Sequence, residues 1–282
     1  MSLLLVERED RVLHLTLNRP QKRNALNIEM CRMLVENIDS VQHDPAIGVI
    51  LIDAAGRVFS AGMDLDEATA SEVDQSIGIH EKLFSIGRDS RKPIVACVNG
   101  PALGGGLGLV AQAHVAVAAQ GSLFGLTEIR TGIWPFLVYR SVEAAIGARR
   151  TLELSLTGRL FSTQEALAWG LIHQAAHAFE MDDRAAAISR DIARASPEAI
   201  RLGIEYVRQS RHKSWAQAGE IAAGLRRLST ASPDFKEGVA AFHAHREPQW
   251  PSMPGPNAPN GTSALPLEWE AEDDKPHIEG PE

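Results

Sequence analysis

A chain of 282 residues, 44% of them hydrophobic, is long enough to bury a sizeable core, as one large domain or as one domain with an appendage. The formal net charge of −8 is concentrated near the end, where seven acids stand against one base from Pro251 onward, so the body carries about −2. A nearly neutral body lacks the broad basic face that nucleic acid or an anionic membrane requires, although local basic spots remain available for a phosphorylated ligand.

No apolar run reaches the roughly 18 to 20 residues that a membrane-spanning helix needs. The start, "MSLLLVERED", lacks the basic n-region and the longer apolar run of a signal peptide, so we expect a cytoplasmic protein. Cys31 and Cys97 lie far apart and fit no C-x-x-C pattern, which favours two reduced, buried thiols.

The first elements expected are a hairpin and a helix. "LLLVERED" pairs with "VLHLTL" (Val12 to Leu17), whose alternation is typical of a half-buried strand. Asn27 is a candidate N-cap for an amphipathic helix that ends before Pro45.

The following segments predict an α/β core. "IGVILID" and "KPIVACVNG" are continuous apolar runs, which suggests strands buried on both faces. "HVAVAA" and "SLFGL" are further strand candidates, whereas Val138 to Ala148 and Ser162 to Trp169 have helical patterns. Strands that alternate with helices indicate the α/β class.

From Ser196 only helical patterns remain, in "SPEAIRLGIEYVRQ", "WAQAGEIAAGLRRL" and "SPDFKEGVAAFHAH". The last 32 residues hold seven of the fifteen prolines and most of the excess acid. We therefore expect a catalytic core over residues 1–195, a helical oligomerisation subdomain over 196–250 and a Pro-rich acidic tail over 251–282.

A glycine run, "PALGGGLGLV" (Pro101 to Val110), interrupts an apolar stretch at a cost of roughly 1 kcal/mol per glycine relative to alanine. The run is no dinucleotide fingerprint, because Leu109 takes the last glycine position, and no P-loop, because Gly106 stands where lysine belongs. A strand that turns into a helix beginning around Gly104 to Gly106 fits better. Its free N–H groups would face a ligand atom that develops negative charge.

A second donor is expected in "GRVFSAGMDLDE" (Gly56 to Glu67), where the small turn Ser60-Ala61-Gly62 exposes the backbone N–H of Met63. At this point the sequence resembles the enoyl-CoA hydratase/isomerase, or crotonase, superfamily from about Leu3 to Trp250. Five motifs carry the resemblance in order: "NRPQKRNALN", "FSAGMDLDE", "NGPALGGGLGL", "FGLTEIRTGIWP" and "SPDFKEGVAAF". Each motif is weak alone, but five in sequence are strong.

The resemblance implies a crotonase-like spiral core of stacked strands and helices with a C-terminal helical subdomain. It also implies an oxyanion hole made by the backbone N–H groups of Met63 and Gly105, which stabilises the enolate oxygen of a CoA thioester. One such donor is typically worth ~3 to 4 kcal/mol of barrier. Glu128 in "FGLTEI" matches the family's glutamate and is the implied general acid/base, a task that needs a carboxylate in a dry pocket.

Two acids that relatives use are missing. Typical hydratases carry a second glutamate three residues after the oxyanion glycine, where this chain has Gly108, and dienoyl isomerases carry an acid where it has Phe136. One carboxylate can still move a proton from C2 to C4. We therefore expect enoyl-CoA isomerisation, with Trp134 and Phe136 shaping an apolar acyl pocket. Hydration is the alternative if Asp66 or Glu67 reaches the water.

We expect no metal and no redox cofactor, since the ten histidines include no H-E-x-x-H. CoA enters as part of the substrate, and the resemblance further implies which residues hold it. Lys22 and Arg23 are candidate phosphate partners, although plain surface charges explain them equally well. Relatives use an aromatic residue and a lysine from a C-terminal helix, which here are Phe242 and His245. The other implied substrate-binding positions are Ala25, Leu26, Ala61, Asp64, Leu65 and Gly104. Family members are usually trimers or dimers of trimers, so we expect a homotrimer or a dimer of trimers.

Two rival functions belong to other classes. Ser60 before Ala-Gly faintly resembles a hydrolase nucleophile turn, but Val58 breaks the G-x-S-x-G pattern, so thioester hydrolysis would more readily use Glu128 and water. A non-catalytic CoA-binding or RNA-binding role is the other rival. RNA binding would need a basic face that the near-neutral body lacks.

Overall fold

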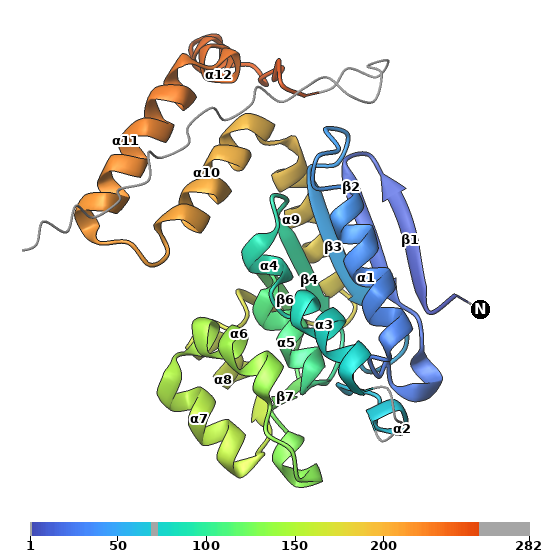
Figure 1. Ribbon diagram of the computed structural model, residues 1–282. Coiled ribbons are helices and arrows are strands. Elements are labelled where there is room, and N and C mark those ends of the chain that lie inside the picture. Colours follow the sequence, from blue (N-terminus) through green and yellow to red (C-terminus); the bar gives the residue numbers. More distant parts are fainter. Residues whose placement is uncertain (1, 69–72, 254–282) are drawn as a thin grey trace, which may run out of the picture.

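The computed structural model describes residues 2–68 and 73–253, so the acidic tail expected over 251–282 lies outside the described residues from position 254 onward (Figure 1). Within the described residues the centre is a six-stranded sheet of order β1-β2-β3-β4-β6-β9. β1 pairs antiparallel with β2, and every later pair is parallel. The strands are β1 (Leu4–Glu9), β2 (Val12–Leu17), β3 (Val49–Ala54), β4 (Ile94–Val98), β6 (Val115–Ala119) and β9 (Gln174–Ala176).

Both faces of this sheet are buried. Along β3, Ile50 and Ile52 join the larger apolar cluster, which includes residues of α1 (Ile28–Ser40), α3 (Val73–Leu83) and α5 (Gly105–Gln112). Val49 and Leu51 point to the other face, into a second cluster under α9 (Met181–Arg194). Two covered faces explain why the strand sequences are continuous apolar runs.

A small sheet of order β5-β7-β8 extends the core. Its strands are β5 (Ala102–Leu103), β7 (Leu123–Gly125) and β8 (Phe161–Ser162). The remaining elements of the core are the 3-10 helices η1 (Pro20–Lys22) and η2 (Glu128–Thr131), and α2 (Leu65–Ala68), α4 (Ile86–Asp89), α6 (Phe136–Ile146), α7 (Ala148–Thr157) and α8 (Thr163–Trp169).

The expected hairpin, strands and first helix are confirmed, and Asn27 caps α1 by accepting the N–H of Met30. The single helix expected over Val138 to Ala148 is wrong in its bounds. Gly147 has φ +86° and separates α6 from α7, so the chain turns there.

Three helices follow the core, as the sequence predicts: α10 (Pro197–Ser210), α11 (Trp215–Ala231) and α12 (Pro233–His243). They extend away from the sheet, and α12 lies far from α2 (Figure 1). Trp250 anchors the segment after α12 by donating its indole N–H to the carbonyl of Arg194 at 2.7 Å. Among the helices of the described residues, none combines the length and the apolar character needed to cross a membrane.

Candidate active site

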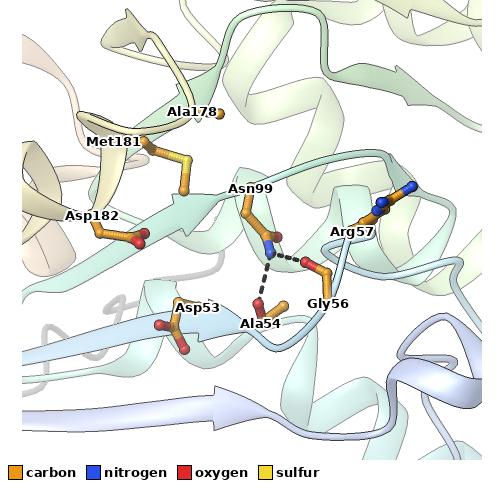
Figure 2. Close-up of a pocket in the computed structure, with 8 residues that line it drawn as sticks. All are labelled: Asp53, Ala54, Gly56, Arg57, Asn99, Ala178, Met181 and Asp182. Atoms are coloured by element: carbon orange, nitrogen blue, oxygen red, sulfur yellow. Dashed lines mark hydrogen bonds between the residues drawn. The ribbon is translucent and has the colours of Figure 1, made fainter.

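The segment that leads from β3 to Met63 is held by two asparagine side chains. Asn24, fully buried, donates its amide N–H groups to the carbonyls of Ala55 and Val58 at 2.9 and 2.8 Å. Asn99, at the end of β4, donates to the carbonyls of Ala54 and Gly56 at 2.7 and 2.8 Å (Figure 2). These bonds satisfy backbone carbonyls at the end of β3 and in the loop that follows, and they fix the course of the loop.

The amide of Met63 faces away from the backbone that supports it. Leu26 donates to the carbonyl of Gly62 at 2.7 Å, and Asp64 donates to the carbonyl of Leu26 at 3.1 Å. Leu26 and Met63 thus form a short parallel bridge, whose hydrogen bonds are made by the residues on either side of Met63, Gly62 and Asp64. The N–H of Met63 therefore points to the opposite side. It donates to no acceptor among the described residues.

The amide of Gly105 is the second free donor. Gly105 is the first residue of α5, so its N–H has no intrahelical partner, and no other described acceptor receives it. Gly104, with φ +50° and ψ −118°, makes the turn into the helix and donates to the carbonyl of Gly125 at 2.8 Å. A Cβ on Gly62 would lie 3.3 Å from the nitrogen of Gly105, so the two donor segments are in contact.

The carboxylate of Glu128 completes the group. Glu128 begins η2 just after β7, and its Oε1 would lie 2.9 Å from a Cβ placed on Gly104. Its Oε2 is covered from solvent and has no hydrogen-bond partner among the described residues. Burial raises the pKa of Glu128 above its ordinary value, against a smaller opposing effect of a backbone hydrogen bond. Two free amides and one carboxylate with a covered oxygen therefore meet in one place.

Replacing Gly104 with alanine tests this close approach. The added Cβ would occupy space within 2.9 Å of Glu128 Oε1, at a residue whose φ of +50° already disfavours a side chain. We expect Gly104→Ala to lower kcat by roughly 10²-fold, because a misplaced catalytic group costs about that much. Gly121→Ala is a suitable control, since Gly121 also has positive φ but open space around it. Equal losses of kcat in both variants would contradict this interpretation.

The position that lacks the second carboxylate, Gly108, is closed by apolar side chains. At Gly108, a Cβ would lie 2.7 Å from Val138 Cγ1 and 2.9 Å from Phe84 Cδ1, so an apolar wall fills this position. The two acids that hydration would require as substitutes already have partners. Glu67 Oε2 accepts the N–H of Ile28 at 2.8 Å, and Asp66 pairs with Lys22 at 2.9 Å.

Ser60 does not have the environment of a nucleophile. It is fully buried, its hydroxyl donates to the carbonyl of Asn24 at 2.8 Å, and the same oxygen accepts the N–H of Gly62 at 3.2 Å. The hydroxyl therefore supports the turn before Met63, and the weak serine-hydrolase pattern has a structural explanation.

The first two motifs expected to hold CoA come together beside the free amides. Besides the bridge between Leu26 and Met63, Ala61 donates to the carbonyl of Arg23 at 2.9 Å. Asp64 is buried and pairs with Arg19, which also donates to the carbonyl of Ala25 at 3.2 Å. Leu65, the first residue of α2, is exposed next to them.

The expected aromatic and C-terminal positions lie outside these two motifs. Trp134 stacks on Tyr139 with ring centroids 6.0 Å apart, whereas Phe136 is 72% exposed at the start of α6. Phe242 is 76% exposed on α12, and His245 follows that helix. In Figure 1, α12 lies far from α2, the helix that begins at Leu65.

A separate cavity of about 410 Å³ lies at the carboxyl ends of β3 and β4, against the start of α9 (Figure 2). Asp53 and Asn99 line it from the sheet, and Met181 and Asp182 line it from α9. None of the expected site residues contributes to it, so it is distinct from the candidate active site.

Several supporting residues were not predicted from the sequence. Asn24 and Asn99 stand inside the quoted motifs, "RNALN" and "VNG", where an asparagine within a loop indicates side-chain bonds to backbone. Phe84 and Val138 have no comparable signal, because an apolar residue in a helical stretch is ordinary core until its neighbours are known.

Comparisons with known proteins give a consistent result. The family model described as "Enoyl-CoA hydratase/isomerase" matches residues 7–253. The "2,3-dehydroadipyl-CoA hydratase" of Escherichia coli is 34% identical over 256 residues, which are 89% of this chain and 99% of that protein. The mitochondrial "Enoyl-CoA hydratase domain-containing protein 3" of Danio rerio is 33% identical, over 88% of each chain. The crystal structure of an enoyl-CoA hydratase from Mycobacterium smegmatis superimposes with a TM-score of 0.85 at 27% identity, over 89% of this chain and 99% of that one.

Proposed function

Because the chain belongs to the enoyl-CoA hydratase/isomerase family and is therefore an enzyme that acts on acyl-CoA, we propose that it moves the double bond of a 3-enoyl-CoA to the 2 position. In this proposal the N–H groups of Met63 and Gly105 bind the thioester oxygen. Glu128 takes a proton from C2, the negative charge spreads over the enolate, and the same carboxyl returns a proton to C4. The carboxylate is regenerated, and no other reactant is needed.

The observation that carries the proposal is the single carboxylate. Glu128 Oε2 is covered and has no partner among the described residues, which suits a base that must meet a carbon-bound proton in a dry site. The position of a second acid is filled by Phe84 and Val138 against Gly108. A carbon-to-carbon proton transfer needs one base and no activated water.

Hydration of a 2-enoyl-CoA is the second candidate. It is favoured by the names of the similar proteins, several of which are called hydratases. To distinguish the two reactions, the full chain is assayed with a panel of 2-enoyl-CoA and 3-enoyl-CoA esters for hydration, bond migration and thiol release. Bond migration faster than hydration supports the proposal. Robust crotonyl-CoA hydration that Glu128→Gln abolishes would replace isomerisation with hydration, and thiol release would indicate a hydrolase.

The pH profile offers a prediction with a definite sign. A base works in its deprotonated form, so activity is lost as pH falls through the pKa of Glu128. Because burial raises this pKa, the loss begins at a higher pH than for an ordinary glutamate. We expect kcat/KM for isomerisation, which reports the free enzyme, to show an acid limb with an apparent pKa above 4.5. A rate that stays flat down to pH 4.5 would contradict the assignment of Glu128 as the base.

We propose that CoA lies along Lys22, Ala25, Leu26, Asp64 and Leu65. The exposure of Phe242 and the distance of α12 from α2 support a trimer or a dimer of trimers, in which Phe242 and His245 serve CoA bound to a neighbouring copy. A cytoplasmic location fits this proposal.

A further inference from the structure

His80, on α3, is a buried histidine with an unsatisfied nitrogen. The residue is 8% exposed, and its Nε2 is covered from solvent with no hydrogen-bond partner among the described residues. Leaving a buried polar atom without a partner costs roughly 1 to 3 kcal/mol, so such an atom in a folded protein calls for an explanation. Six buried side-chain atoms of the described residues are in this condition, and Glu128 Oε2 is another of them.

Phe84 links His80 to the candidate active site. The ring of His80 stacks on that of Phe84, with centroids 6.3 Å apart and planes at 22°. The far edge of the Phe84 ring packs on α5, with Cζ 3.1 Å from the Cβ position of Gly105. One aromatic ring therefore separates His80 from the residue whose N–H faces the thioester oxygen. An acyl chain that starts at this amide and runs along the Phe84 ring would lead toward His80.

The charges around His80 restrict which chemical groups of a ligand can bind to it. Burial lowers the pKa of His80 below its ordinary value, and the negative charge of Glu67 opposes this effect only in part, so the imidazole is neutral at pH 7. Glu67 also disfavours a second anion nearby, and its carboxylate is already bonded to the N–H of Ile28. A neutral imidazole beside a carboxylate suits an uncharged oxygen and disfavours a carboxylate on the ligand.

We propose that His80 determines acyl specificity by forming a hydrogen bond from Nε2 to an uncharged oxygen, a hydroxyl or carbonyl group, on the acyl chain of the substrate. This inference rests on the proposed function, because it needs the thioester oxygen to lie at Met63 and Gly105. It adds a substrate class, acyl-CoA esters with an oxygen function along the chain.

The test compares esters that differ in one group. 3-Octenoyl-CoA is assayed beside analogues with one hydroxyl at C6, C7 or C8 and beside the analogue with a terminal carboxylate. We expect the full chain to prefer one hydroxyl ester over the plain ester by roughly tenfold in kcat/KM, about the value of one hydrogen bond. His80→Leu should bring this ratio to about one, whereas His80→Gln, which keeps an uncharged polar group, should retain part of it.

Two controls distinguish an effect on substrate specificity from an effect on the stability of the fold. Leu83→Met changes buried packing on the same helix without a polar atom and should leave the ratio unchanged. His80→Leu should also raise Tm, because it removes an unsatisfied nitrogen. An unchanged ratio in His80→Leu, whatever the change in Tm, would overturn the proposal.

Binding makes the test independent of turnover. The affinities of octanoyl-CoA and of its hydroxylated analogues, which cannot isomerise, are measured by calorimetry for the full chain and for His80→Leu. If the native chain isomerises no ester but His80 still governs the preference for the hydroxyl, the proposed reaction fails and the specificity role stands. If isomerisation occurs but neither rates nor affinities depend on His80, only the specificity role fails.

Discussion

Glu128→Gln is expected to lower kcat/KM for 3-enoyl-CoA isomerisation by roughly 10²- to 10⁴-fold, the range that general acid–base groups contribute. The amide keeps the size of the side chain but cannot take a proton from C2. The substituted side chain would still lie against Gly104, so the two free amides should bind the thioester as before. We therefore expect the loss in kcat, with KM little changed, in a steady-state assay of bond migration.

Glu81→Gln is the matched control for this variant. Glu81 is an exposed glutamate on α3, so its substitution removes the same charge without touching the site. The control should retain native kcat. Native activity in Glu128→Gln, or an equal loss in both variants, would remove Glu128 from the mechanism and leave the donors at Met63 and Gly105 without a base.

The elements that could be predicted from the sequence are mostly those with a clear local pattern of apolar and capping residues. The strands β3, β4 and β6 are apolar runs, and α1 has both a capping asparagine and an amphipathic stripe. α9 was missed, although it covers a whole face of the sheet. Its buried positions are Met181, Ala185, Ser189 and Ala193, at the four-residue spacing of a helix, and three of the four are small or polar, so the helix is amphipathic but has low overall hydrophobicity. They suit a helix that packs closely on strands, which the sequence alone does not reveal.

The residues of the candidate site also fall into two groups, those with a signal in the sequence and those without one. Gly104 and Glu128 lie in motifs whose residue types are chemically informative, and the structure brings them into contact. Phe84, Val138 and His80 lie outside those motifs: His80 is in α3, Phe84 follows that helix, and Val138 is in α6. Their importance depends on what they touch. The free amide of Met63 is a property of the neighbouring backbone bonds, so the side chain at 63 carries no information about it.

Gly108→Ala is expected to destabilise the protein by about 1 to 3 kcal/mol, measured by denaturant unfolding. A Cβ there would lie 2.7 Å from Val138 and 2.9 Å from Phe84, and overpacking a close-packed core costs about that much. Gly78→Ala, in the exposed part of α3, meets nothing within 4 Å. This control should instead gain roughly 0.4 to 1 kcal/mol, because alanine restricts the unfolded chain more than glycine does.

Gly108→Glu extends the same argument to the reaction. The substitution introduces an acid at the position where the family resemblance leads us to expect one, but it must bury a carboxylate against Val138 and Phe84, which already fill this space. We expect a larger loss of stability than for Gly108→Ala and no gain in crotonyl-CoA hydration. If Gly108→Glu folds with native stability and hydrates crotonyl-CoA, the side chains of Phe84 and Val138 can move to accommodate a carboxylate. In that case the single carboxylate would not by itself decide which reaction the site performs.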